Sequence, residues 1–158
     1  MMKTLVVTAA VLGLLGAVTS GFAEDADRGT AAEARAMLDR VVIAVKADKA
    51  KALASIATGG DGFLDRDLYP FCFNNTDGII HPYPNPSSKS LFGQDERTVK
   101  DAVGKNVGQE LYDAAQKPEG QVSEVSYVYF RPSDGSPAPK VSFVTRIGDL
   151  GCGVGYYE

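Results

Sequence analysis

The chain has 158 residues and a formal net charge of −4, with 16 Lys and Arg against 20 Asp and Glu. This length suits one domain that can bury a core without several disulfides or a structural metal. The basic residues are scattered along an acidic chain. The composition therefore excludes a nucleic-acid-binding protein or a protein that binds an anionic membrane surface.

Residues 1–23 predict an export signal peptide. Lys3 supplies a short positive region, residues 5–18 are largely apolar, and Gly21-Phe22-Ala23 forms a small-x-small cleavage site. The apolar run of about 14 residues is shorter than the roughly 20 that a spanning helix requires. We therefore expect a single domain over residues 24–158, periplasmic or secreted, with no stable membrane insertion after cleavage. An uncleaved anchor is the alternative.

Two regions have helical patterns. Apolar residues recur at three- and four-residue steps from residue 30 to about 57, where Thr30 and Glu33 form a capping box and Asp48 restarts the helix. Gly59-Gly60 ends this region. A second helix is predicted over residues 107–117 and ends before Pro118.

The remaining patterns predict antiparallel strands. Residues 68–74 read as a strand that returns at residues 79–81, and residues 121–130 begin a three-strand meander that ends in a closing hairpin. Helices that precede and interrupt such strands indicate an α+β fold, with an antiparallel sheet of about five strands covered on both faces.

The closing hairpin gives the most specific structural prediction. A turn at Gly148-Asp149 pairs Ile147 with Leu150 and places Lys140 opposite Tyr157. Glycines 151, 153 and 155 then share one face of the sheet, where another group must approach the backbone closely. That group is either a helix or a small ligand beside a cation. We favour the long N-terminal helix, with Lys140 reaching a pocket from the strand end.

Cys72 and Cys152 favour one disulfide in an exported chain. Both residues lie in strand-like runs, so a cross-strand bridge forms if those strands are neighbours. The alternative is two buried thiols that act as small hydrophobic side chains.

The order of short motifs resembles single Cache domains of type 2, which are extracytoplasmic small-molecule sensors with a PAS/profilin-like fold. The matching pieces are Ala52-Leu53-Ala54-Ser55-Ile56, Asp67-Leu68-Tyr69-Pro70-Phe71, Asp77-Gly78-Ile79-Ile80-His81-Pro82, Leu91-Phe92-Gly93, Asp101-Ala102-Val103-Gly104-Lys105, Pro139-Lys140-Val141-Ser142-Phe143 and Gly153-Val154-Gly155-Tyr156-Tyr157. The resemblance implies a long N-terminal helix packed on the sheet and a pocket for a small organic acid. Phe143 stands where this family usually has tyrosine.

Five residues are candidates for ligand binding. Lys140 can pair with a ligand carboxylate, and His81, the chain's single histidine, can donate a hydrogen bond to one. Tyr127 and Tyr129 share a strand face and offer hydroxyl groups, while Tyr83 can close over a pocket. The alternatives are an edge lysine that discourages strand pairing, a histidine bonded to backbone, tyrosines of the core and a surface Tyr83.

The sequence shows no metal-ligand cluster, nucleophile pair or carboxylate constellation, so we expect neither an enzyme nor a cofactor. The predicted function is a soluble ligand-binding sensory module that takes a small carboxylate and passes its signal to a membrane receptor or histidine kinase. The alternative is a ligand-free structural or partner-binding protein of the same shape.

Overall fold

The computed structural model describes residues 27–158, so the predicted signal peptide at residues 1–23 lies outside the described residues. The elements in chain order are α1 (Ala31–Ala47), α2 (Lys49–Thr58), β1 (Pro70–Asn74), the 3₁₀ helices η1 (Pro86–Leu91) and η2 (Glu96–Thr98), α3 (Val107–Ala115), β2 (Val122–Phe130), β3 (Pro137–Ile147) and β4 (Leu150–Tyr157).

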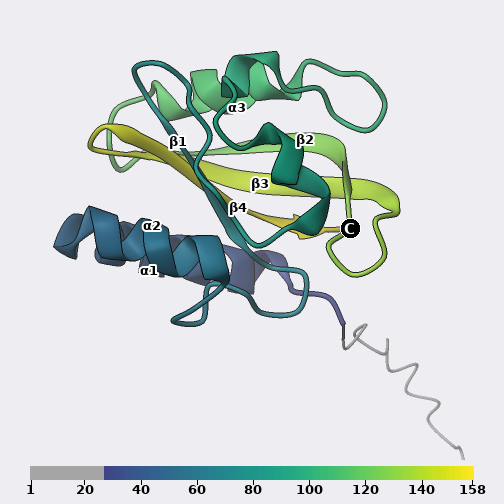
Figure 1. Cartoon of the computed structure of the whole chain (residues 1–158), viewed down its shortest axis with the longest axis horizontal. Coiled ribbons are helices and arrows are strands. Elements are labelled where there is room, and N and C mark those ends of the chain that lie inside the picture. The colour runs from purple at the N-terminus through teal and green to yellow at the C-terminus, as the bar shows by residue number, and fades with distance from the viewer. Residues whose placement is uncertain (1–26) are drawn as a thin grey trace, which may run out of the picture.

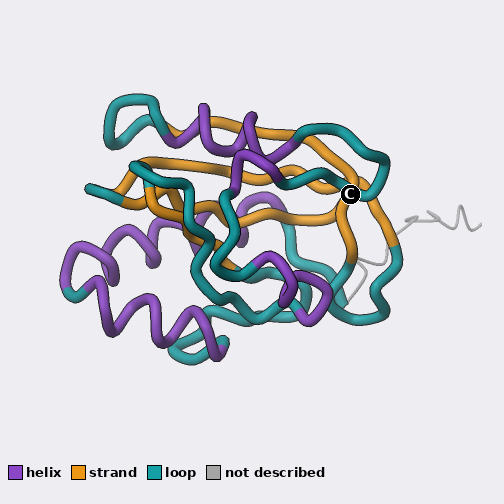
Figure 2. Tube along the Cα trace, turned by 45° about the horizontal axis from the view of Figure 1, so that its top comes forward, coloured by secondary structure: helices purple, strands orange, loops and turns teal. Residues whose placement is uncertain are grey.

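The four strands form one antiparallel sheet in the order β1-β4-β3-β2. Helices α1 and α2 cover one face, and α3 lies on the other (Figure 1). The tube in Figure 2 shows the strands between these two helical layers. The prediction of an α+β fold with a helix-covered antiparallel sheet is therefore confirmed.

The sheet has four strands rather than about five, because residues 79–81 do not form a strand. Ile79 and Ile80 make only isolated bridges, to Asp95 and Phe73 respectively. The next residue after His81 is Pro82, which lacks an amide hydrogen and cannot extend a ladder. The chain therefore leaves the sheet at this point and enters the loop of residues 82–93.

The helical region begins and ends as the sequence predicts. Thr30 and Glu33 form the capping box of α1, and the Asp48 side chain accepts a hydrogen bond from the amide of Lys51 at the start of α2. Gly59 ends α2 in the left-handed conformation with φ +72°, which glycine adopts without a steric cost. Helix α3 ends at Ala115, two residues earlier than predicted.

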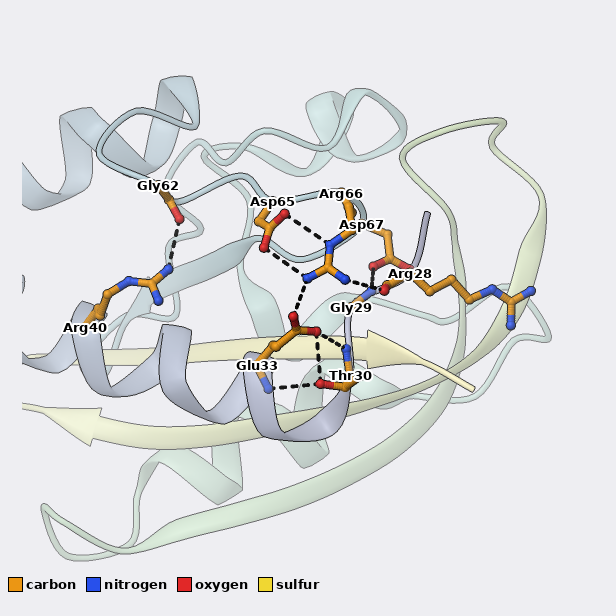
Figure 3. Close-up of polar contacts among 9 residues, drawn as sticks. All are labelled: Arg28, Gly29, Thr30, Glu33, Arg40, Gly62, Asp65, Arg66 and Asp67. Carbon is orange, nitrogen blue, oxygen red and sulfur yellow. Dashed lines mark hydrogen bonds and ion pairs between the residues drawn. The ribbon is translucent and has the colours of Figure 1, made fainter. Parts of the chain in front are cut away.

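A polar cluster fixes the start of α1 to the segment that enters β1 (Figure 3). The Arg66 guanidinium donates to the Arg28 carbonyl oxygen at 2.7 Å and pairs with Glu33 at 2.7 Å and Asp65 at 3.1 Å. The buried Asp67 carboxylate accepts the Gly29 amide at 2.7 Å. These contacts anchor the segment that leads into β1, which begins at Pro70, to the start of α1.

Cys72 and Cys152 form a disulfide, as the sequence predicts. The two residues are direct partners in the β1–β4 ladder, with their Cα atoms 4.1 Å apart. The bridge therefore ties the edge strand β1 to the last strand of the meander. Because Cys152 is paired with Thr145, the bridge lies on the sheet face that α1 covers.

The closing hairpin has the predicted register. Ile147 pairs with Leu150 and Lys140 with Tyr157, around a turn in which Gly148 has φ +59°. The expectation that the N-terminal helix packs on the glycines is wrong, because α1 lies on the opposite face (Figure 1). Side chains that reach over from the neighbouring strands and from α3 approach the glycines instead: Phe73 and Ala115 at Gly151, Phe71 at Gly153, and Lys140 and Ser142 at Gly155.

Helix α3 approaches η2 so closely that only glycine fits at position 108. A Cβ atom at Gly108 would overlap the backbone carbonyl oxygen of Glu96, and backbone atoms cannot rotate out of the way as a flexible side chain can. The amide of Gly108 also donates to the Val99 carbonyl oxygen at 3.0 Å. This contact holds η2 against the first turn of α3.

We expect Gly108→Ala to lower the free energy of unfolding by about 3 kcal/mol, because overpacking against backbone forces the two elements apart. Alanine is the better helix former by about 1 kcal/mol. Helix propensity therefore favours the variant, and the expected loss of stability arises from the clash alone. Chemical denaturation measures the change. Gly60→Ala is the control, since the nearest atom to its added methyl group is Thr58 Oγ1 at 3.3 Å, and the next, the Ser55 carbonyl oxygen at 3.7 Å, is at ordinary contact distance. Equal stability of Gly108→Ala and wild type would contradict the prediction.

Candidate ligand-binding site

A cavity of about 20 Å³ lies on the glycine face of the sheet. This volume suits about one water molecule. The strands, α3 and the residues between β1 and α3 enclose it, and the lining residues are Tyr69, Phe71, Tyr83, Leu91, Glu96, Val99, Val107, Leu111, Tyr127, Tyr129 and Lys140. Four of the five predicted site residues are among them.

Lys140 is a fully buried cation at the cavity, with 1% of its surface exposed. Its Nζ lies 2.8 Å from the Tyr69 hydroxyl and 3.5 Å from the Tyr157 hydroxyl. The same atom lies 4.2 Å from the ring centroid of Tyr69 and 4.7 Å from that of Tyr157, within the range of cation–π attraction. The alternative of a solvated edge lysine is wrong.

The absence of a side chain at Gly155 makes this burial sterically feasible. A Cβ atom there would overlap Cε of Lys140 and the Ser142 hydroxyl. The lysine stem therefore lies across β4 at the position where the backbone carries only hydrogen.

Burial lowers the pKa of Lys140 to about 7, and the negative charge of Asp67 opposes this change. Lys140 makes no ion pair with another described residue. Near neutral pH the ammonium form is thus poorly compensated. An anion that entered the cavity would stabilise it directly.

Tyr127 and Tyr129 project from β2 into the same space. Their rings lie edge to face with centroids 5.8 Å apart. The Tyr127 hydroxyl lies 2.8 Å from Ser142 Oγ, and the Tyr129 hydroxyl lies 3.0 Å from Ser88 Oγ. Both hydroxyl groups are therefore already hydrogen-bonded to protein groups.

Tyr83 closes the cavity from the loop of residues 82–93. It is 9% exposed, stacks on Tyr69 at 5.7 Å between centroids and meets the edge of Phe92 at 5.1 Å. Asn85, two residues further on, donates to the Tyr69 hydroxyl at 2.7 Å. The loop is thus attached to the residue that also contacts Lys140, and the alternative of a surface Tyr83 is wrong.

His81 lies outside the cavity. Its Nε2 is 2.8 Å from the side-chain oxygen of Asn74, at the end of β1. Burial and the nearby Lys49 lower its pKa. The structure therefore does not bring His81 together with the other four predicted site residues.

The sequence analysis did not predict three polar residues of the site: Tyr69 and Glu96, which line the cavity, and Tyr157, whose hydroxyl lies near Lys140. The predicted hairpin register already placed Tyr157 opposite Lys140, so that signal was present. Glu96 lies in the run Asp95-Glu96-Arg97, which is typical of a solvated surface segment. In the structure η2 packs on α3, and the Glu96 side chain is buried and lines the cavity.

Within residues 27–158, no group of three or more His, Cys, Asp or Glu side chains is placed to hold a metal ion. Over the same range, no helix combines the length and the apolar character needed to cross a bilayer.

The sheet, the covering helix and the closing hairpin agree with a known family. The model of the family described as Single Cache domain 2 matches residues 44–157. The chain belongs to this family. The match begins within α1 and extends to the last residue of β4, so it contains every residue that lines the cavity.

Solved Cache structures share the fold at low sequence identity. A methyl-accepting chemotaxis protein from Vibrio parahaemolyticus RIMD 2210633 is 24% identical with a TM-score of 0.62, over 80% of this chain and 86% of that one. A periplasmic sensor domain of a chemotaxis protein is 21% identical with a TM-score of 0.55, over 80% and 88% of the two chains.

A Cache chemosensory domain described for its carboxylic acid recognition is also 21% identical, with a TM-score of 0.56 over 80% of this chain and 86% of that one. No curated protein matches the chain.

Proposed function

We propose that this single Cache domain is an extracytoplasmic sensory module that binds a small organic acid at Lys140 and passes its occupancy to a membrane receptor or histidine kinase. The main support for this proposal is that the buried Lys140 ammonium group lines the cavity and has no ion-pair partner among the described residues. A carboxylate supplies the missing charge. The carboxylic acid recognition by a Cache chemosensory domain of the same fold supports this ligand class.

The site provides both charge and orientation. Lys140 is held by Tyr69 and Tyr157, and the aromatic walls exclude water, so a hydrogen bond between ammonium and carboxylate is strong there. Tyr127 and Tyr129 supply apolar rings for the short carbon chain of the acid.

Binding requires the cavity to enlarge, since about 20 Å³ does not hold an acid of several atoms. The loop of residues 82–93 is the mobile wall in this proposal, because Tyr83 closes the space and the loop contributes no strand to the sheet. Outward movement of Tyr83 would break its stack on Tyr69. Ligand occupancy would thereby change the conformation of a surface loop, as a signal to a partner requires.

The test compares wild type with Lys140→Met in calorimetric titrations with acetate and propionate at pH 6, where Lys140 is charged. We expect wild type to bind and the variant to bind at least tenfold more weakly, since methionine fills the same space without a charge. Melting temperatures with and without acid give a second readout.

Lys100→Met, at an exposed position, is the matched control and should bind as wild type does. Equal affinity of Lys140→Met and wild type would overturn the role of Lys140. If none of acetate, propionate, glycolate and glycine bound wild type at millimolar concentration, the alternative of a ligand-free structural or partner-binding protein would be favoured.

A further inference from the structure

A second buried polar residue faces the cavity that holds Lys140. Glu96 is 6% exposed, lines the cavity, and makes no side-chain hydrogen bond or ion pair to another described residue. A buried carboxyl group without a partner is costly to fold around. Its position in the cavity therefore points to a ligand group that satisfies it.

The backbone around Glu96 holds this side chain in place. Its amide donates to the Gly78 carbonyl oxygen at 2.8 Å, and its carbonyl group packs against Gly108 at the start of α3. Val99, Val107 and Leu111 surround the cavity on the same side. The backbone at Glu96 is thus anchored, and its side chain lines the cavity together with these three apolar residues.

Lys140 and Glu96 approach the cavity from different layers. Lys140 comes from strand β3 of the sheet, and Glu96 comes from η2, which packs on α3. The two side chains do not form an ion pair with each other. A ligand between them therefore meets a cation on one side and a carboxyl group on the other.

An acid with no polar group besides its carboxylate satisfies only Lys140. It pairs with Lys140 but leaves Glu96 facing an alkyl group, or facing the ligand's own negative charge if Glu96 is ionised. Burial, with a smaller contribution from Asp95, raises the pKa of Glu96 to about 8. An ionised Glu96 is therefore unfavourable unless a donor group lies next to it.

We propose that Glu96 is a specificity-determining residue, and that the site prefers a short acid that carries a hydrogen-bond donor, an amino or hydroxy group, on the carbon next to its carboxylate. This inference rests on the proposed function and names the ligand class of the same site. The carboxylate pairs with Lys140, and the donor group contacts the Glu96 carboxyl oxygen. A site built to bond a polar group discriminates strongly against an analogue that lacks it.

Acetate, glycolate and glycine test this assignment, because they differ only in the group on the carbon beside the carboxylate. Calorimetric titration of the full domain at pH 7 should show at least one of glycolate and glycine binding about tenfold or more tightly than acetate. In Glu96→Leu, the ratio of the affinity for glycolate or glycine to the affinity for acetate should fall to about one or invert. Acetate binding itself should be retained or improved.

Two further variants complete the experiment. Glu96→Gln keeps the shape and a hydrogen-bonding amide, so it should retain part of the preference for glycolate, and it serves in place of Glu96→Leu if that variant does not fold. Glu124→Gln, at an exposed position on β2, should leave all three affinities unchanged.

Equal binding of the three acids to wild type, or an unchanged ratio in both Glu96 variants, would overturn the assignment and leave the role of Lys140 intact. Binding of glycine or glycolate without binding of acetate would support it. Failure of all three acids to bind would overturn the proposed function and this assignment together.

Discussion

Removal of the Cys72–Cys152 disulfide by the double substitution Cys72→Ala/Cys152→Ala is expected to lower the free energy of unfolding by about 4 kcal/mol. The bridge closes a loop with a sequence separation of 80 residues, and the chain-entropy model assigns a loop of this length roughly that value. Denaturation curves measure the loss. The slope of the unfolding free energy against denaturant should also increase, because an unbridged unfolded chain exposes more surface.

The same loss should result from reduction of the wild-type bridge, and the double variant should not respond to reductant. The effect should extend to the cavity, because β1 is an edge strand whose one neighbouring strand is β4, and β1 leads into the loop that carries Tyr83. A double variant within about 1 kcal/mol of wild type would contradict the prediction.

The second large effect is a minimum in stability near neutral pH that originates in two buried groups. Burial raises the pKa of Glu96 from 4.5 to about 8. The folded state therefore binds more protons than the unfolded state in this range, and stability falls as pH rises from 4.5 to 8.

Burial lowers the pKa of Lys140 from 10.5 to about 7. The unfolded state then binds more protons between these values, so this contribution makes stability rise with pH from 7 to 10.5. Between about pH 7 and pH 8 the buried Glu96 and the buried Lys140 both lower the stability of the folded state, so the minimum lies there.

Urea denaturation of wild type, Lys140→Met and Glu96→Gln across pH 5 to 10 separates the two groups. Lys140→Met should be most stabilised relative to wild type below pH 7 and should lose that advantage toward pH 10.5. Glu96→Gln should gain relative stability from pH 4.5 to 8. Each unit of pKa difference corresponds to about 1.4 kcal/mol, so these changes are measurable. Differences that do not vary with pH would show that neither group titrates abnormally in the folded protein.

Local sequence patterns predicted much of the fold. The capping box of Thr30 and Glu33, the restart at Asp48 and the turn at Gly148 each depend on a few neighbouring residues, and all three are present. The predicted strand at residues 79–81 is absent because Pro82 ends its pairing and the chain turns away from the sheet there.

The candidate site was predicted in part. Lys140, Tyr127 and Tyr129 lie on adjacent strands, and strand alternation places them on one face. Tyr83 reaches the same cavity from the loop of residues 82–93. No periodic sequence pattern predicts the path of that loop. His81 is adjacent to that loop in sequence, but its ring turns to Asn74 instead of the cavity.

The hairpin register follows from the local sequence, because side chains alternate with a period of two and the turn residues fix the pairing. The sequence also identified the two cysteines that pair and the lysine that faces the glycines. Packing between distant segments determines which helix covers which face, and it places η2 against Gly108 with the Glu96 side chain buried. Contacts of this kind join segments that are distant in the sequence, so the periodic pattern of either segment does not predict them. Whether a charged residue such as Glu96 faces solvent or the cavity is therefore settled only when the layers pack.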